Sequence, residues 1–159
     1  MIYFMGVDPG MTGAFAIITD EGNFVRVEDW QDPLWPVLQQ TPFNIPRPWG
    51  WVDVKLAVIE KVWAMPKQGV SSSFHFGENF GAWKMALQAL GVPFMVEATT
   101  KIRKILDSSV PHKPSKEDLR QYAIRRFPDA AQFLTRKGDH GRAEALVMAL
   151  YARSIYGQH

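Results

Sequence analysis

The sequence contains no cysteine among its 159 residues. This absence excludes disulfide bonds, a thiol nucleophile and any zinc or iron–sulfur centre that depends on cysteine ligands. A metal ion would therefore have to be held by carboxylates, histidine or water. No apolar run reaches the ~18 residues that a membrane span requires, and the N-terminus lacks the basic and apolar regions of a signal peptide. We expect a cytoplasmic protein without a membrane partner.

The composition is that of one globular domain spanning residues 1–159, with 47% hydrophobic and 21% charged residues. A net charge of +2 and a pI near 8.9 are only weakly basic, and an ordinary soluble surface explains them as well as nucleic-acid binding does. The stretch 101–126 is more informative, because it holds eight Lys or Arg against three Asp or Glu. This local excess is suited to a surface that follows a phosphate backbone.

Three strands are predicted near the N-terminus, at residues 2–8, 14–19 and 24–30, and their short connections indicate an antiparallel meander. Residues 31–51 then contain five prolines and three tryptophans. Prolines at this density exclude a long helix or a central strand. We interpret this segment as a packed loop, with a partner-binding loop as the alternative.

The remainder of the chain alternates strands and helices. The continuous apolar run 56–59, which ends in Glu60, predicts a strand buried on both faces. The other expected elements are a loop at 64–73, a helix at 74–90, a strand at 93–97, a loop at 107–115 and helices at 115–127 and 140–155. This order predicts an α/β fold with a mixed five-stranded sheet flanked by helices.

Several acids occupy unusual positions. Asp8 and Glu60 each end a predicted strand, and Glu144 lies among alanines and leucines on the last helix. If the two strands are neighbours, their carboxylates meet at one edge of the sheet and repel each other, unless a hard cation such as Mg²⁺ or Mn²⁺ binds between them. Asp139 and His140 begin the last helix and are further candidates. Blander alternatives are a turn former for Asp8, an N-cap for Asp139 and a structural or solvent-facing role for His140.

Three motifs resemble those of the RuvC-type Holliday junction resolvases, which have a ribonuclease H-like fold. They are Gly6–Ala14 (GVDPGMTGA), Ile59–Trp63 (IEKVW) and Arg142–Leu146 (RAEAL). They follow the family's order across nearly the whole chain, and the first is the most specific. The family often has a second acid three residues before the last one, whereas this chain has Gly141. The Pro/Trp segment 31–51 also stands where bacterial members of the family have a helix. That departure, together with the short chain, suggests a phage-type branch, acting in the host cytosol.

The resemblance implies an endonuclease that resolves Holliday or other branched DNA junctions in recombination and repair. Two Mg²⁺ ions about 4 Å apart would promote hydrolysis to 5′-phosphate and 3′-hydroxyl ends. Asp8 would bridge both ions, Glu60 would bind one, and Glu144 would bind the other together with Asp139 or His140.

The resemblance also implies DNA contacts. Trp63 stands where the family has an aromatic wedge, although packing in the core is an equal alternative. Lys61 and Lys67 lie near the active edge, and Arg103 and Lys116 stand where the family has basic residues. A homodimer is implied, because a junction requires two symmetric cuts. The helix at 74–90 is the expected dimer surface, although an apolar stripe that packs against the core would have the same spacing.

Three alternative functions remain open. A nuclease of RNA–DNA hybrids or replication forks would use the same fold. A catalytically silent junction-binding protein would account for the imperfect last motif. An actin-like phosphotransferase also opens with a strand ending in Asp, but it needs two such domains, for which 159 residues are too few.

Overall fold

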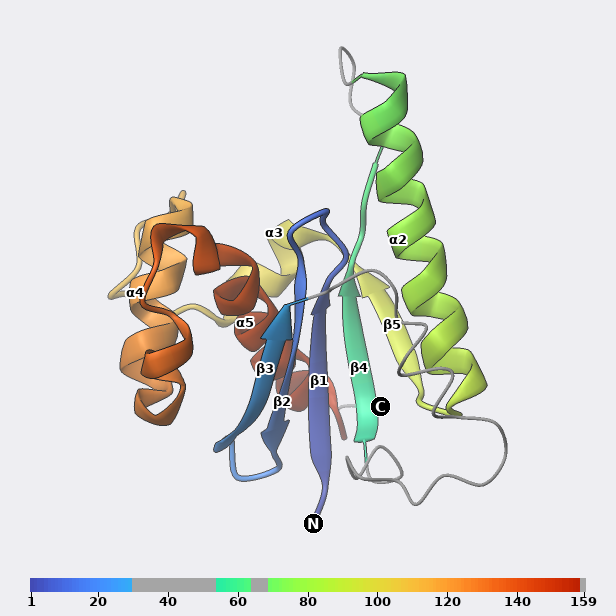
Figure 1. Ribbon diagram of the computed structural model, residues 1–159. Helices are drawn as coiled ribbons and strands as arrows, with labels where there is room; N and C mark the ends of the chain where they lie inside the picture. Colours follow the sequence, from blue (N-terminus) through green and yellow to red (C-terminus); the bar gives the residue numbers. More distant parts are fainter. Residues whose placement is uncertain (30–53, 64–68, 158–159) are drawn as a thin grey trace.

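The computed structural model describes residues 1–29, 54–63 and 69–157. Five strands form one mixed sheet in the order β3-β2-β1-β4-β5 (Figure 1). They are β1 (Tyr3–Asp8), β2 (Ala14–Thr19), β3 (Phe24–Asp29), β4 (Val54–Glu60) and β5 (Phe94–Glu97). The first three strands form an antiparallel meander, whereas β4 runs parallel to β1 and β5 runs parallel to β4. The predicted α/β class and mixed five-stranded sheet are confirmed.

Helices cover both faces of the sheet. Helix α2 (Val70–Ala89) lies on one face, and α5 (His140–Ile155) lies on the other with α4 (Lys116–Arg126) packed beside it (Figure 1). The shorter helices are α3 (Thr99–Ile102), η2 (Arg103–Ile105), η3 (Pro128–Phe133) and η4 (Lys137–Asp139). Within the described ranges, no helix combines the length and apolar character needed to cross a membrane.

The two-residue period of the central strands divides the interior into two cores. Phe4 and Val58 belong to the core beneath α4 and α5, whereas Met5 and Ile59 belong to the core beneath α2. Successive side chains on a strand point to opposite faces. The acidic residues that end β1 and β4 therefore continue the series that faces α5, and not the one that faces α2.

Helix α5 crosses β1 in close contact at Gly6. A Cβ at this position would lie 2.0 Å from the carbonyl oxygen of Ala145 and 2.4 Å from the backbone nitrogen of Ala149. Only glycine permits the two backbones to approach this closely. The contact holds the second and third turns of α5 against β1.

One element boundary differs from the sequence prediction, and some short helices were not predicted. The loop expected at 64–73 is wrong in its last part, because α2 begins at Val70 and not at residue 74. Its first turns extend beyond the sheet (Figure 1), so they bury little and show no apolar periodicity. Helix α3 and η2 were not predicted, since each is too short to display a period. The Pro/Trp segment 31–51 lies outside the described residues.

Candidate metal centre

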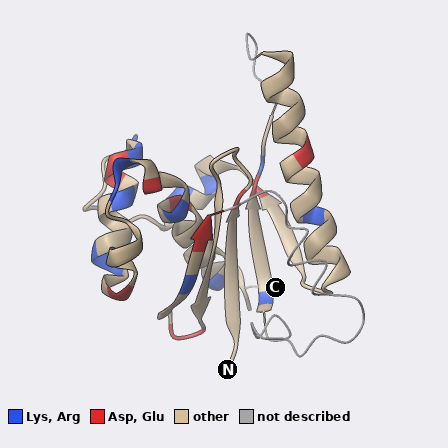
Figure 2. Ribbon diagram, in the orientation of Figure 1, with Lys and Arg blue, Asp and Glu red and all other residues tan. Residues whose placement is uncertain are grey.

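Three carboxylates meet at one edge of the sheet. Asp8 ends β1, Glu60 ends β4, and Glu144 lies in the second turn of α5. The strands β1 and β4 are parallel neighbours with Val7 opposite Ile59, so both acids leave the sheet on the same side. The acidic positions at these strand ends lie next to each other in Figure 2. One oxygen from each of the three carboxylates lies within 4.8 Å of the others.

The turn after β1 holds Asp8 in a defined orientation. The backbone N–H of Gly10 donates to Asp8 Oδ1 over 2.9 Å, and the N–H of Gly13 donates to the carbonyl of Gly10 over 2.9 Å. A Cβ at Gly13 would lie 2.0 Å from the carbonyl oxygen of Asp8. Asp8 itself is 8% exposed. The glycines therefore allow a turn tight enough to direct a nearly buried carboxylate toward α5.

Glu60 is oriented by a residue that the sequence analysis did not identify. The hydroxyl of Thr99 donates to Glu60 Oε1, and the N–H of Lys61 donates to the carbonyl of Glu97 over 2.8 Å, which ties the end of β4 to β5. Thr99 begins α3 just after β5. The sequence does show a hydroxyl residue, Thr99, just after the strand predicted at 93–97. It does not show that this strand lies beside the one that ends in Glu60.

The negative charges of the three carboxylates are only partly compensated by positive groups of the protein. Burial, and then the charge of Glu60, raises the pKa of Asp8 to about 6, against the opposing effects of the Gly10 N–H, His140 and Lys116. Burial, and then the charges of Asp8 and Glu60, raises the pKa of Glu144 to about 7, with Lys116 and Arg103 opposing. This donor set of closely spaced oxygens fits a hard divalent cation.

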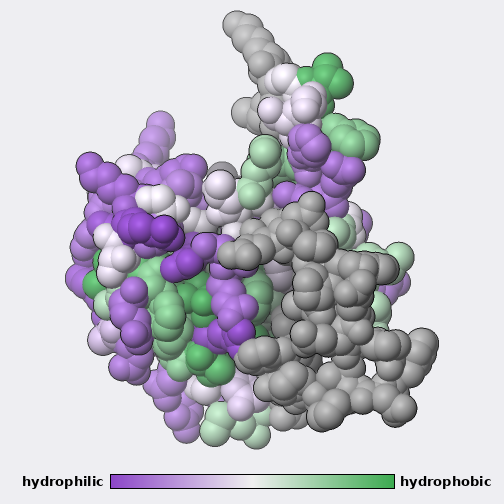
Figure 3. Space-filling view, viewed as in Figure 1, coloured by the Kyte–Doolittle hydropathy of each residue, from purple (hydrophilic) through white to green (hydrophobic). Residues whose placement is uncertain are grey.

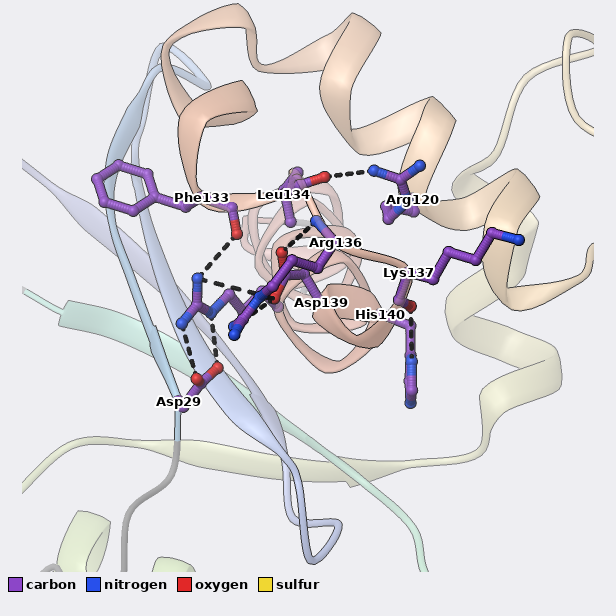
Figure 4. A network of polar contacts seen from close by, with 9 residues as sticks. Asp29, Arg120, Phe133, Leu134, Arg136, Lys137, Asp139 and His140 are labelled. Atoms are coloured by element: carbon purple, nitrogen blue, oxygen red, sulfur yellow. Dashed lines mark hydrogen bonds and ion pairs between the residues drawn. The ribbon is translucent and has the colours of Figure 1, made fainter.

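Asp139 does not join the cluster. Its Oδ2 accepts the backbone N–H of Arg136 over 2.8 Å, and its Oδ1 accepts the Arg136 guanidinium over 2.8 and 3.1 Å (Figure 4). The guanidinium of Arg142 lies 4.0 Å from the same oxygen. Burial alone would raise the pKa of Asp139, but the hydrogen bonds and charge of Arg136, aided by Arg142, lower it overall. Asp139 thus joins the turn before α5 to the helix itself.

The expected DNA-binding residues lie in different settings. Trp63 is 62% exposed, so it lies outside the core, and Lys61 Nζ lies 3.9 Å from the centre of its ring. Half-buried Arg103 lines a cavity beside Glu60 and Glu144, which also includes Thr99 and apolar side chains from α3, α4 and α5. Lys116 is exposed at the start of α4, and Lys67 falls outside the described residues.

Two solved structures share this architecture. One, of Thermus thermophilus RuvC in complex with a Holliday junction substrate, is 15% identical, with a TM-score of 0.60 over 99% of this chain and 96% of that chain. The other, of Thermus thermophilus RuvC, is 17% identical, with a TM-score of 0.60 over 96% of each chain. The chain has the RuvC fold. The ribonuclease H-like architecture predicted from the sequence is thereby confirmed. No protein-family model matches the sequence, and no curated protein matches it.

Proposed function

We propose that this chain is a metal-dependent endonuclease of the RuvC type that cleaves Holliday or other branched DNA junctions. The observation that carries the proposal is the cluster of Asp8, Glu60 and Glu144 at the edge of a RuvC-type sheet. The fold and the acidic cluster have different origins, since one is a property of the backbone and the other of three side chains. Their coincidence favours a nuclease over a junction-binding protein without activity. A role in recombination and repair in the cytosol, and a phage-type origin, remain predictions.

The three carboxylates would hold the metal ion. Mg²⁺ prefers oxygen ligands, and Mn²⁺ accepts the same ligands. The raised pKa values of Asp8 and Glu144 indicate that a nearby positive charge would stabilise their ionised forms. When bound, the metal would supply an activated water and Lewis-acid stabilisation for phosphodiester hydrolysis to 5′-phosphate and 3′-hydroxyl ends.

The surrounding residues support binding of a DNA strand at this edge. Thr99 orients Glu60. The positive charges of Lys116 and Arg103 oppose the rise in the pKa of Glu144 that burial, Asp8 and Glu60 cause. Their positive charges would attract a backbone phosphate. The exposed ring of Trp63 offers a stacking surface, and stacking of a base on an aromatic ring contributes about 1–3 kcal/mol.

We further propose that the nuclease acts as a homodimer, because symmetric resolution of a four-way junction requires two active sites. The apolar stripe predicted on the helix at 74–90 packs against the sheet, with Trp83 and Leu87 buried. A dimer contact through α2 would therefore use its exposed apolar residues Val70, Phe74 and Met85. The projecting end of this helix is visible in Figure 3. Light scattering over a concentration series would measure the state of assembly.

The decisive experiment is a cleavage assay with Mg²⁺ on four-way junctions, replication forks, RNA–DNA hybrids and linear duplex. We expect cleavage of the four-way junction, and abolition of cleavage by Asp8→Asn and by Glu144→Gln with junction binding retained. Asp129→Asn, which alters an exposed acid on η3, serves as the control. Undiminished cleavage by Asp8→Asn would refute the site. Preferential cleavage of hybrids would reassign the substrate, and binding without cleavage would favour the silent alternative.

A further inference from the structure

The turn that leads into α5 is open on its outer side. Residues 135–138 are all exposed, whereas Asp139, which follows them, is buried with only 3% of its side chain exposed. A Cβ at Gly138 would meet no other atom of the described residues within 4 Å. A ligand can therefore reach both the backbone and the side chains of this turn.

Arg136 is exposed but already oriented. Its side chain is 70% exposed, and its Nε and one terminal nitrogen donate to Asp139 Oδ1 over 3.1 and 2.8 Å (Figure 4). A guanidinium has five N–H groups, so three of them have no hydrogen-bond partner among the described residues. An arginine that is held in advance loses less conformational freedom when it binds a ligand. Its remaining N–H groups suit the oxygens of a phosphate.

The acids on this side of α5 each have an arginine partner. The pairs are Asp139 with Arg136, Asp29 with Arg142, and Glu117 with Arg120. Lys137 forms no ion pair with a described residue, and its charge acts on Glu117, which Arg120 already binds. Figure 4 shows the side chain of Lys137 directed away from the network. The turn therefore keeps a positive charge beside the unused N–H groups of Arg136, which favours an anionic ligand.

The same turn lies close to the metal centre. Gly141 packs on the turn between β1 and β2, where its Cβ would lie 3.1 Å from Asp8 Oδ2 and 2.7 Å from the carbonyl oxygen of Thr12. Arg136 is five residues before Gly141, which is about 10 Å of chain at the rise of a tight helical turn. One strand of B-DNA advances about 3.4 Å per nucleotide. Arg136 is therefore about three nucleotides away from a strand position at Asp8.

His140 joins the turn to the start of α4. Its Nδ1 lies 3.3 Å from the carbonyl oxygen of Lys137, and its Nε2 lies 3.2 Å from Lys116 Nζ. The exposed lysine of α4 and the turn are thus neighbours around one imidazole ring. The positive surface at the start of α4 therefore continues onto the turn before α5.

From this juxtaposition, and resting on the proposed function, we propose that Arg136, oriented by Asp139, binds a backbone phosphate of the DNA strand that crosses the metal centre, within about three nucleotides of the cut. Asp139 is a positioning residue, and Lys137 adds electrostatic attraction. Because phosphate contacts fix the register of a protein on DNA, this contact determines which phosphodiester bond lies over the three carboxylates.

Junction binding by the full chain, with Ca²⁺ in place of Mg²⁺, tests the contact on junctions that carry one uncharged methylphosphonate at each position near the cut. In the wild type, one such substitution within about three nucleotides of the cut should weaken binding about 10-fold, as loss of a charge-assisted contact does. Arg136→Met should weaken binding of the unmodified junction to the same extent, and should no longer respond to that methylphosphonate. Its slope of log affinity against log salt should fall by about 1.

The control is Lys55→Met, which removes an exposed charge from the end of β4 opposite to Glu60. This variant should respond to every methylphosphonate as the wild type does. A scan of Arg136→Met that matches the wild-type scan would overturn the inference.

Asp139→Asn tests the positioning role. One amide oxygen cannot replace both carboxylate oxygens of Asp139, so the response to the same methylphosphonate should shrink although Arg136 is present. Arg136→Lys should keep the salt slope but lose the position-specific response, because an ammonium lacks the planar donors of a guanidinium. Thermal unfolding checks that each variant is folded in the assay. A lower melting temperature in Asp139→Asn with the full phosphate response would confine this residue to a structural role and overturn the positioning.

Single-turnover cleavage at saturating protein gives a second readout. Arg136→Met should keep a rate constant near that of the wild type, because Arg136 does not contact the reacting atoms, but its cuts should spread to neighbouring bonds. A large loss of rate with unchanged binding and unchanged cut position would contradict a contact that sets the register.

Failure of the proposed function gives a different result. In that case the wild-type protein would neither bind nor cleave the junction, or Asp8→Asn would cleave it undiminished. Failure of the present inference alone leaves wild-type binding and cleavage in place, with an unchanged phosphate scan in Arg136→Met. The two failures are therefore distinguishable.

Discussion

Replacement of Asp8 by asparagine should stabilise the metal-free protein at pH 8 and have little effect near pH 4. Burial, followed by the charge of Glu60, raises the pKa of Asp8 from 3.8 to about 6. The folded protein therefore keeps this proton at a pH where the unfolded chain has lost it, and stability falls as the pH rises through this interval. At 1.36 kcal/mol per pKa unit, the difference corresponds to about 3 kcal/mol.

Asparagine removes that cost with little change in shape. Its side-chain oxygen can still accept the N–H of Gly10, which Asp8 Oδ1 accepts over 2.9 Å in the structure. It also removes the charge that raises the pKa of Glu144. The stabilisation should therefore come from electrostatics, growing as the pH rises from 3.8 to about 6 and levelling off above the folded-state pKa of Asp8.

The assay is urea unfolding followed by tryptophan fluorescence, in the presence of a chelator, from pH 4 to pH 8. The variant should gain about 3 kcal/mol at pH 8, or roughly 6–12 °C in melting temperature for a domain of this size. Saturating Mg²⁺ should reverse the order, because ligand binding stabilises only a protein that retains the site. Asp129→Asn should change nothing. A gain that is independent of pH, or a loss of stability at pH 8 in chelator, would refute this reasoning.

Three further substitutions test how the fold supports the site. Gly6→Ala should destabilise the protein by on the order of 3 kcal/mol in urea unfolding, because its Cβ would enter the backbone of α5; an unchanged midpoint would refute the close contact. Arg142→Met should cost about 1–3 kcal/mol, because its guanidinium donates to both oxygens of Asp29 over 2.6 and 2.7 Å; Asp29→Asn should cost less than this, and the reverse order would contradict the assignment. Thr99→Val should weaken Mn²⁺ binding about 10-fold by releasing Glu60, while Thr99→Ser should restore it, and equal affinities in all three proteins would exclude an orienting role.

Local chemistry made much of the fold predictable from the sequence. The strands are short apolar runs bounded by turn residues, and α5 has a clear apolar period, so their positions agree closely with expectation. The start of the helix predicted at 115–127 also agrees, because Ser115 and Asp118 form a capping box with both of its hydrogen bonds. These features depend on residues a few positions apart, which is why a single sequence reveals them. The extra turns at the start of α2 bury little and therefore had no such signal.

The sequence by itself determined that three acids stand at the ends of two strands and on the last helix, and that their ligand chemistry is that of a hard cation. The tertiary structure decided which of the remaining candidates could join them. Asp139 is held by arginines that precede and follow it, and His140 is turned toward Lys116 from α4. Side-chain direction at a helix start depends on what packs around it, and Lys116 is 24 residues away in the sequence. Spacing therefore located Asp8, Glu60 and Glu144, whereas packing alone determined where their neighbours point.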